Sequence, residues 1–138
     1  MSNLLVQNIK HTNATTSMAI DTSGQVTIRG EGSATTTNLQ QGLCKVWVKF
    51  DGTDTGSGYH DSLNASSLTD HATGEFQVFI TNDMGNDDYA AFVTSTFYSG
   101  VASEAATLVG STRIFTGNAS GAGSDREETT TSIFGDLA

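Results

Sequence analysis

Three histidines, one cysteine and fifteen acidic residues are the side chains of this 138-residue chain on which metal or catalytic chemistry would depend. His11, His60 and His71 are scattered, with no pair at i and i+4. No cysteine stands at the spacing from them that a zinc site uses. Cys44 begins an alternating apolar stretch, which predicts a small buried thiol. These residues predict no metal site.

One acidic turn has part of a calcium-loop pattern. The segment 51–56 places glycine at its sixth position, but threonine stands at the third and fifth positions. Ser62 occupies the twelfth position, where a calcium loop needs a bidentate glutamate. A second acidic turn contains Asp83, Asp87 and Asp88. We predict that both turns are solvated and hold no metal.

Serine, histidine and aspartate are all present, but no pattern joins them into a nucleophilic site. No Gly-x-Ser-x-Gly elbow stands at a strand-to-helix turn, and Cys44 lacks an evident helix N-terminus. The sequence therefore predicts no catalytic residue, no cofactor and no enzyme activity.

The aromatic residues Trp47 and Tyr59 are the remaining candidates for a binding site. Trp47 lies in the segment 44–50, whose side chains alternate in polarity as a half-buried strand requires. The alternation puts on one face Val46, Val48 and Phe50, and on the other Lys45, Trp47 and Lys49. Either protein also covers the second face, or Trp47 is an aromatic anchor between two cations. Trp47 and Tyr59 are thus candidate ligand-stacking or interface residues, with core or subunit packing favoured for Trp47.

The first thirty residues predict a small attachment segment. The segments 18–20 and 26–28 alternate and are joined by a polar loop with Gly24, which is typical of a hairpin. Two strands alone are marginally stable, so we expect them to dock on another subunit or a partner protein. The predicted attachment or oligomer interface consists of the apolar residues Leu4, Leu5, Val6, Ile9, Met18, Ile20, Val26 and Ile28.

The rest of the chain predicts a linker over 31–43 and a β-domain over 44–138. Segments 76–81, 89–97, 112–116 and 128–134 are short strand patterns separated by turn residues. Leu63 and Leu68 are expected to reach the core from an irregular or weakly extended segment. For 100–110 a helix and a surface loop both fit. The predicted fold is all-β: a short hairpin or extended arm, then an antiparallel, jelly-roll-like β-sandwich.

Composition and charge exclude some partners. The net charge of −9 opposes binding to nucleic acid and to anionic membrane surfaces. No segment has the roughly 20 apolar residues of a transmembrane helix. The hydrophobic fraction of 36% is low, which favours burial between subunits as well as within one. We therefore expect a homo-oligomer.

Two parts of the chain carry a family resemblance. The segments 3–16 and 18–24 resemble the start of tail-fibre-like structural proteins of marine tailed bacteriophages. The segments 45–52, 61–70, 73–76, 81–84 and 133–136, in that order, resemble a small C-terminal β-domain of phage fibre and appendage proteins.

The resemblance implies a virion structural protein, assembled in the host cytoplasm and exposed on the particle as a short fibre, receptor-binding tip or knob. Its implied partners are sister copies, with a trimer suggested by the family, and other tail or capsid proteins. A host-surface glycan is a further possible partner. A capsid-surface decoration protein and a free carbohydrate-binding module are the alternative functions.

Overall fold

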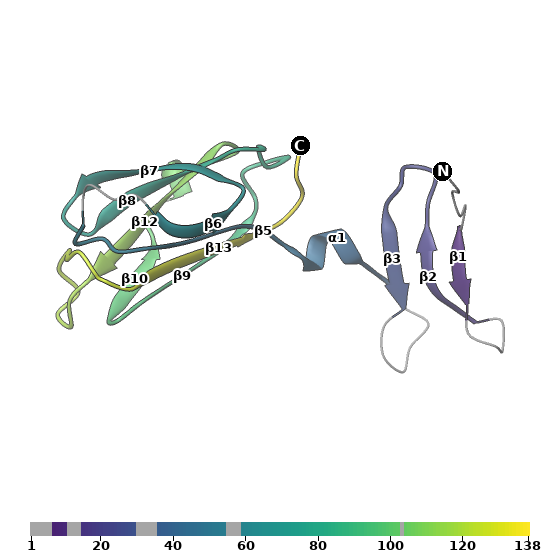
Figure 1. The fold of residues 1–138 in the computed structure, drawn as a ribbon, viewed down its shortest axis with the longest axis horizontal. Helices are drawn as coiled ribbons and strands as arrows, with labels where there is room; N and C mark the ends of the chain where they lie inside the picture. The colour runs from purple at the N-terminus through teal and green to yellow at the C-terminus, as the bar shows by residue number, and fades with distance from the viewer. Residues whose placement is uncertain (1–6, 11–14, 30–35, 55–58, 103) are drawn as a thin grey trace. The chain divides into compact units, whose positions relative to one another are not determined.

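The chain divides into two compact units, Met1–Leu43 and Cys44–Ala138. We describe them from a computed structural model, which defines residues 7–10, 15–29, 36–54, 59–102 and 104–138 (Figure 1). Each unit is built from antiparallel strands. The all-β class predicted from the sequence is confirmed.

The N-terminal unit is a four-stranded sheet whose strands follow one another in chain order. Its strands are β1 (Asn8–Lys10), β2 (Thr16–Ile20), β3 (Val26–Arg29) and β4 (Thr36–Asn38). The predicted hairpin corresponds to β2 and β3. Asp21 organises its turn, because one carboxylate oxygen accepts hydrogen bonds from the backbone N–H groups of Ser23 and Gln25, each at 2.8 Å.

Part of the segment predicted as a linker, 31–43, belongs to this sheet instead. Strand β4 pairs with β3, and a single helical turn, α1 (Leu39–Gly42), follows it. Asn38 caps the turn by accepting a hydrogen bond from the Gln40 N–H at 2.8 Å. The sequence did not predict this strand, because Thr36–Asn38 contains no apolar residue and so shows no alternation of apolar and polar side chains.

The second unit is a sandwich of two antiparallel sheets. One sheet has the order β6-β5-β13-β9, and the other has the order β10-β12-β8-β7, with β11 also pairing to β12. Their strands are β5 (Cys44–Phe50), β6 (Tyr59–Leu63), β7 (Ala65–Ala72), β8 (Glu75–Ile80), β9 (Ala90–Ser95), β10 (Tyr98–Val101), β11 (Thr107–Leu108), β12 (Ser111–Gly117) and β13 (Thr129–Phe134). The predicted antiparallel sandwich is confirmed.

The core lies between these sheets and follows the alternation of the strands. One cluster of buried residues consists of Val48, Phe50, Phe76, Val78 and Ile114, and a second consists of Val46, Ile80, Met84 and Ile133. Phe50 and Phe76 meet edge to face across the core, with ring centroids 5.0 Å apart. Full burial of such side chains contributes about 1.5–3 kcal/mol each, so the clusters dominate the stability of the sandwich.

Several local expectations differ from the structure. The segment 62–68 spans the end of β6 and the start of β7. Leu63 is 47% exposed rather than in the core, because its register places it opposite Trp47 on the outer face. The segment 100–110 is neither one helix nor one loop: it contains the end of β10, a short 3-10 turn (Glu104–Ala106) and β11.

Candidate interaction surfaces

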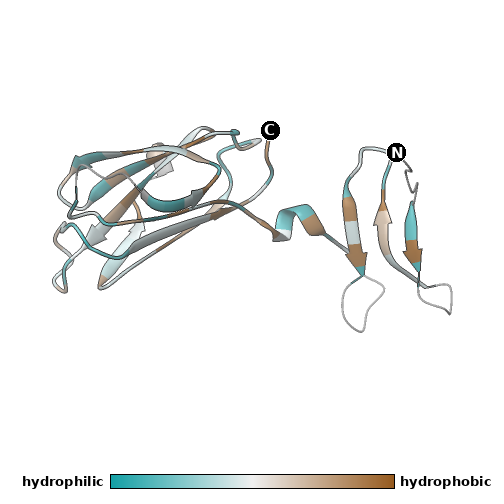
Figure 2. Cartoon of the chain, in the orientation of Figure 1, coloured by the Kyte–Doolittle hydropathy of each residue, from teal (hydrophilic) through white to brown (hydrophobic). Residues whose placement is uncertain are grey.

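The N-terminal sheet separates apolar from polar side chains by face. Ile9, Met18 and Ile28 are cross-strand neighbours in one row, so their side chains leave the same face of the sheet. Ile20 and Val26 form the next pair on that face. Brown bands on β3 in Figure 2 mark this alternation. These five residues were predicted as interface residues, and the sheet brings them together.

None of these five apolar side chains is fully buried. Ile9 is 54% exposed, and the other four are half-buried. No second layer packs on them from the described residues of the sheet. Their neighbours on the opposite face include Asn8, Ala19 and Thr27. The predicted interface residues Leu4, Leu5 and Val6 lie outside the described residues.

Charge is divided unequally between the two units. Met1–Leu43 contains Lys10 and Arg29 against Asp21 and Glu31, so its net charge is zero. Cys44–Ala138 contains the other four basic and thirteen acidic residues and therefore the whole net charge of −9. The apolar face of the N-terminal sheet thus belongs to the neutral part of the chain.

A second apolar surface lies on the outer face of the β6-β5-β13-β9 sheet. Trp47 is half-buried there and is absent from both core clusters. Its cross-strand neighbours are Leu63 and Ser132, and Ser132 in turn pairs with Phe92. The Phe92 ring, 60% exposed, meets that of Phe134 edge to face at 5.9 Å. Within this chain, Trp47 is therefore a surface aromatic and not a core residue.

The cations predicted beside Trp47 also lie on this strand. Lys49 makes an ion pair with Glu128 at 2.7 Å, but both side chains are largely exposed, so the pair contributes little stability. Tyr59 lies opposite Phe50 in the backbone register of β6, and its side chain lies outside the described part of the chain.

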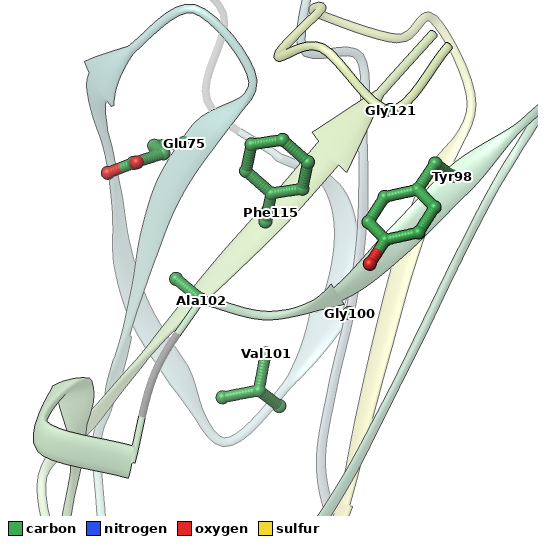
Figure 3. Close-up of a pocket in the computed structure, with 7 residues that line it drawn as sticks. All are labelled: Glu75, Tyr98, Gly100, Val101, Ala102, Phe115 and Gly121. Atoms are coloured by element: carbon green, nitrogen blue, oxygen red, sulfur yellow. The ribbon is translucent and has the colours of Figure 1, made fainter. Parts of the chain in front are cut away.

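A groove that sequence analysis missed lies on the outer face of the other sheet (Figure 3). This open depression has a volume of about 500 Å³, and Glu75, Tyr98, Gly100 and Phe115 are among its lining residues. Phe115 lies between Glu75 and Tyr98, which come from β8 and β10. The feature that indicates the groove is the cross-strand pairing of Gly100 with Phe115, and this pairing is known only from the strand register of the structure.

A polar network continues from the groove across the same sheet. His71 Nε2 lies 2.7 Å from Gln77 Oε1, and the Gln77 amide donates to the Ser111 hydroxyl at 2.9 Å. Arg113 lies 4.0 Å from Glu75, and its buried Nε has no hydrogen-bond partner. His71 lies near the end of β7.

Two side chains in the described part of the chain have a shifted pKa, and each shift has a local structural cause. Hydrogen bonds from the Thr53 hydroxyl and N–H lower the pKa of Asp51, which is consistent with a turn carboxylate. Burial raises the pKa of Tyr89, whose hydroxyl lies 3.0 Å from the carbonyl oxygens of Leu108 and Ser111. Among the described residues, no group of three His, Cys, Asp or Glu side chains is placed to hold a metal ion.

Comparison of the chain with protein-family models, with curated proteins and with solved structures found no match. None of the helices in the described ranges is long and apolar enough to cross a membrane. Function is therefore inferred from the two-unit organisation, the surfaces described above and the sequence resemblance.

Proposed function

We propose that this chain is a non-enzymatic virion structural protein that assembles through its N-terminal sheet and presents its sandwich as a short fibre tip or knob. The single observation that carries the proposal is the apolar face formed by Ile9, Met18, Ile20, Val26 and Ile28, on which the described residues of the N-terminal sheet place no second layer. A sheet with one apolar face becomes stable when a second layer covers that face. The resemblance to phage appendage proteins supports the virion setting.

A second copy of the same sheet is the layer we propose. Two neutral units approach each other without net repulsion, whereas two sandwiches that each carry −9 repel. A symmetric dimer places the same face of each copy in contact, and an apolar face packs favourably against another apolar face. Assembly would then display several sandwiches from one base, and their weak contacts would add by avidity.

The mass of the full chain in solution tests this proposal. We expect a multiple of 14.4 kDa for the natural sequence. Met18→Lys and Ile28→Lys place a charge on the apolar face, and burying it unpaired is costly, so both variants should be monomers. Thr27→Lys is the matched control, since it lies on β3 but on the opposite face, and it should keep the assembled mass.

Two results would contradict the assembly proposal. One is a natural chain that is monomeric at tens of micromolar concentration. The other is an oligomer that Thr27→Lys disrupts as strongly as Ile28→Lys. The sandwich should keep its circular dichroism spectrum in all three variants, which separates loss of assembly from loss of folding.

Copy number per particle separates a tail location from the alternative of capsid decoration. Tail symmetry gives copies on the order of tens or fewer, whereas a capsid lattice gives on the order of a hundred or more. Quantitative mass spectrometry of purified particles, normalised to the major capsid protein, measures this number. Absence of the chain from purified particles would contradict the virion proposal altogether.

A further inference from the structure

The groove beside Tyr98 and Phe115 is formed by side chains that the core does not use. Phe76 follows Glu75 on β8, and Ile114 precedes Phe115 on β12. The side chains of Phe76 and Ile114 are buried in the core. Glu75 and Phe115 therefore lie on the outer face, where the depression of about 500 Å³ opens. This volume is within the range of small-molecule sites.

The groove offers an aromatic surface that is accessible from solvent. The rings of Tyr98 and Phe115 meet edge to face, with centroids 5.8 Å apart, and Tyr98 is 57% exposed. Gly100 is the cross-strand neighbour of Phe115, so the β10 residue directly opposite Phe115 has no side chain. A methyl group placed on Gly100 would meet no atom within 4 Å, which shows that the space beside it is open.

A carboxylate stands on the other side of the Phe115 ring. The Glu75 side chain is 39% exposed, and its ion pair with Arg113 is 4.0 Å long, which is beyond hydrogen-bond distance. Its oxygens can therefore accept hydrogen bonds from a ligand hydroxyl, and a charged acceptor strengthens such bonds. The lining of the groove thus includes an apolar ring surface and a carboxylate, on neighbouring strands in which Glu75 is the cross-strand partner of Phe115.

We infer that this groove binds a neutral saccharide, with the apolar C–H face of a pyranose against Tyr98 and Phe115 and its hydroxyls donating to Glu75. A pyranose carries both features on one small ring. The net charge of −9 on the same unit disfavours anionic sugars. The inference rests on the proposed function for its biological role, since a displayed sandwich would use the groove to contact a glycan surface.

Amide ¹H–¹⁵N spectra of the full chain test the inference, with four probes titrated separately. The probes are methyl β-D-glucopyranoside, methyl β-D-galactopyranoside, N-acetylglucosamine and sialic acid. We expect at least one of the three neutral sugars to shift the amides of Tyr98, Gly100 and Gly121 saturably, with a Kd near about 1 mM. We expect no saturable shift at these amides with sialic acid.

Variants connect the shifts to the groove. Tyr98→Ala should weaken binding about tenfold or more, since it removes the exposed ring. Gly100→Leu should abolish binding, because its side chain extends into the open space of the groove, where an added Cβ meets no atom within 4 Å. Phe92→Ala is the matched control, an exposed aromatic residue on the opposite sheet, and should leave the Kd unchanged. The dispersion of each spectrum reports whether the variant is folded.

Three results would overturn the inference: no shift at the groove with any neutral sugar, equal binding of sialic acid, or a Kd that Gly100→Leu leaves within twofold. The mass of each sample, measured in parallel, keeps the two proposals separate. A monomer that binds sugar contradicts the assembly proposal alone. An oligomer that binds none of the probes contradicts the groove proposal alone.

Discussion

Gly74 is the position at which the sandwich leaves least room for a side chain. Its φ is +78°, in the left-handed region that favours glycine. A Cβ there would lie 2.2 Å from the Thr116 carbonyl oxygen and 2.6 Å from the Ser124 nitrogen. Its N–H also donates to the Asp125 carboxylate at 2.6 Å, and its carbonyl accepts from the Thr116 N–H at 2.7 Å. The turn after β7 therefore depends on a residue without a side chain.

Gly74→Ala should destabilise the sandwich by about 3 kcal/mol or more, because backbone strain and a clash with fixed main-chain atoms add. Gly121→Ala is the matched control, with φ +83° and no atom within 4 Å of the added methyl. It should cost only about 1 kcal/mol, from φ alone. Urea unfolding followed by fluorescence measures both. Equal losses in the two variants would show that the clash at Gly74 relaxes.

Tyr89 makes the free energy of unfolding depend on pH in the alkaline range. Burial raises its pKa above the ordinary value of 10.0, so the folded state keeps a proton that the unfolded chain loses. The stability that follows from this difference is fully present below about pH 10 and is lost as pH rises through the folded-state value. The free energy of unfolding should therefore fall above pH 10 in the natural chain.

The free energy of unfolding, measured between pH 8 and 11, tests this effect in the natural chain, Tyr89→Phe and Tyr98→Phe. Tyr89→Phe should lose about 1 kcal/mol at pH 8, because its hydroxyl no longer donates to the Leu108 or Ser111 carbonyl. Its stability should also fall less steeply above pH 10. Tyr98→Phe, which removes an exposed hydroxyl, should keep the alkaline fall of the natural chain. The prediction fails if Tyr89→Phe keeps the same slope.

At the scale of strands, sequence periodicity predicted the elements that bury one face. β5 and β8 alternate strictly, and Val46, Val48, Phe76 and Val78 are buried as the pattern required. β7 was missed because only one of its eight residues is a large apolar side chain. Met84 lies in the loop between β8 and β9, yet it is 1% exposed. The ladder bridge between Met84 and Leu137 fixes it there, a contact that no local pattern indicates.

Surfaces were less predictable than strands, because they depend on which strands are neighbours. The N-terminal interface residues that can be described share one face, since β1, β2 and β3 are consecutive and hairpin register follows from the chain. The groove instead joins Glu75, Tyr98 and Phe115 from strands that are distant in sequence. Leu63 was misplaced for the same reason, because only the register shows that it shares a face with Trp47.

The Asn118 side chain organises the first turn of the loop between β12 and β13. The Asn118 side-chain oxygen accepts hydrogen bonds from the Ser120 N–H at 2.9 Å, the Ser120 hydroxyl at 2.7 Å and the Ala122 N–H at 3.1 Å. Asn118→Ala should therefore destabilise the sandwich by about 1–2 kcal/mol. Asn86→Ala, whose side chain accepts one bond, from the Asp88 N–H, should cost clearly less. Thermal unfolding compares them, and a larger loss in Asn86→Ala would contradict this account.

At the scale of the whole molecule, apolar surface and charge are assigned to different units. The sandwich has two buried core clusters and the entire net charge, and the N-terminal sheet has no buried apolar residue among those described and no net charge. A folded, acidic body resists nonspecific association, while a neutral sheet with an apolar face favours it. This division predicts that assembly responds to salt in a particular direction.

Raising sodium chloride from about 0.05 to 0.5 M should strengthen self-association. Salt shortens the screening length from more than 10 Å to less than 8 Å, which weakens repulsion between sandwiches that each carry −9. Apolar contact between the N-terminal sheets is not weakened by this screening. Sedimentation equilibrium of the full chain should therefore give a dissociation constant that falls with salt, and Thr27→Lys should behave in the same way. A dissociation constant that rises with salt would mean that ion pairs hold the copies together, and the apolar face would then lose its role as the assembly surface.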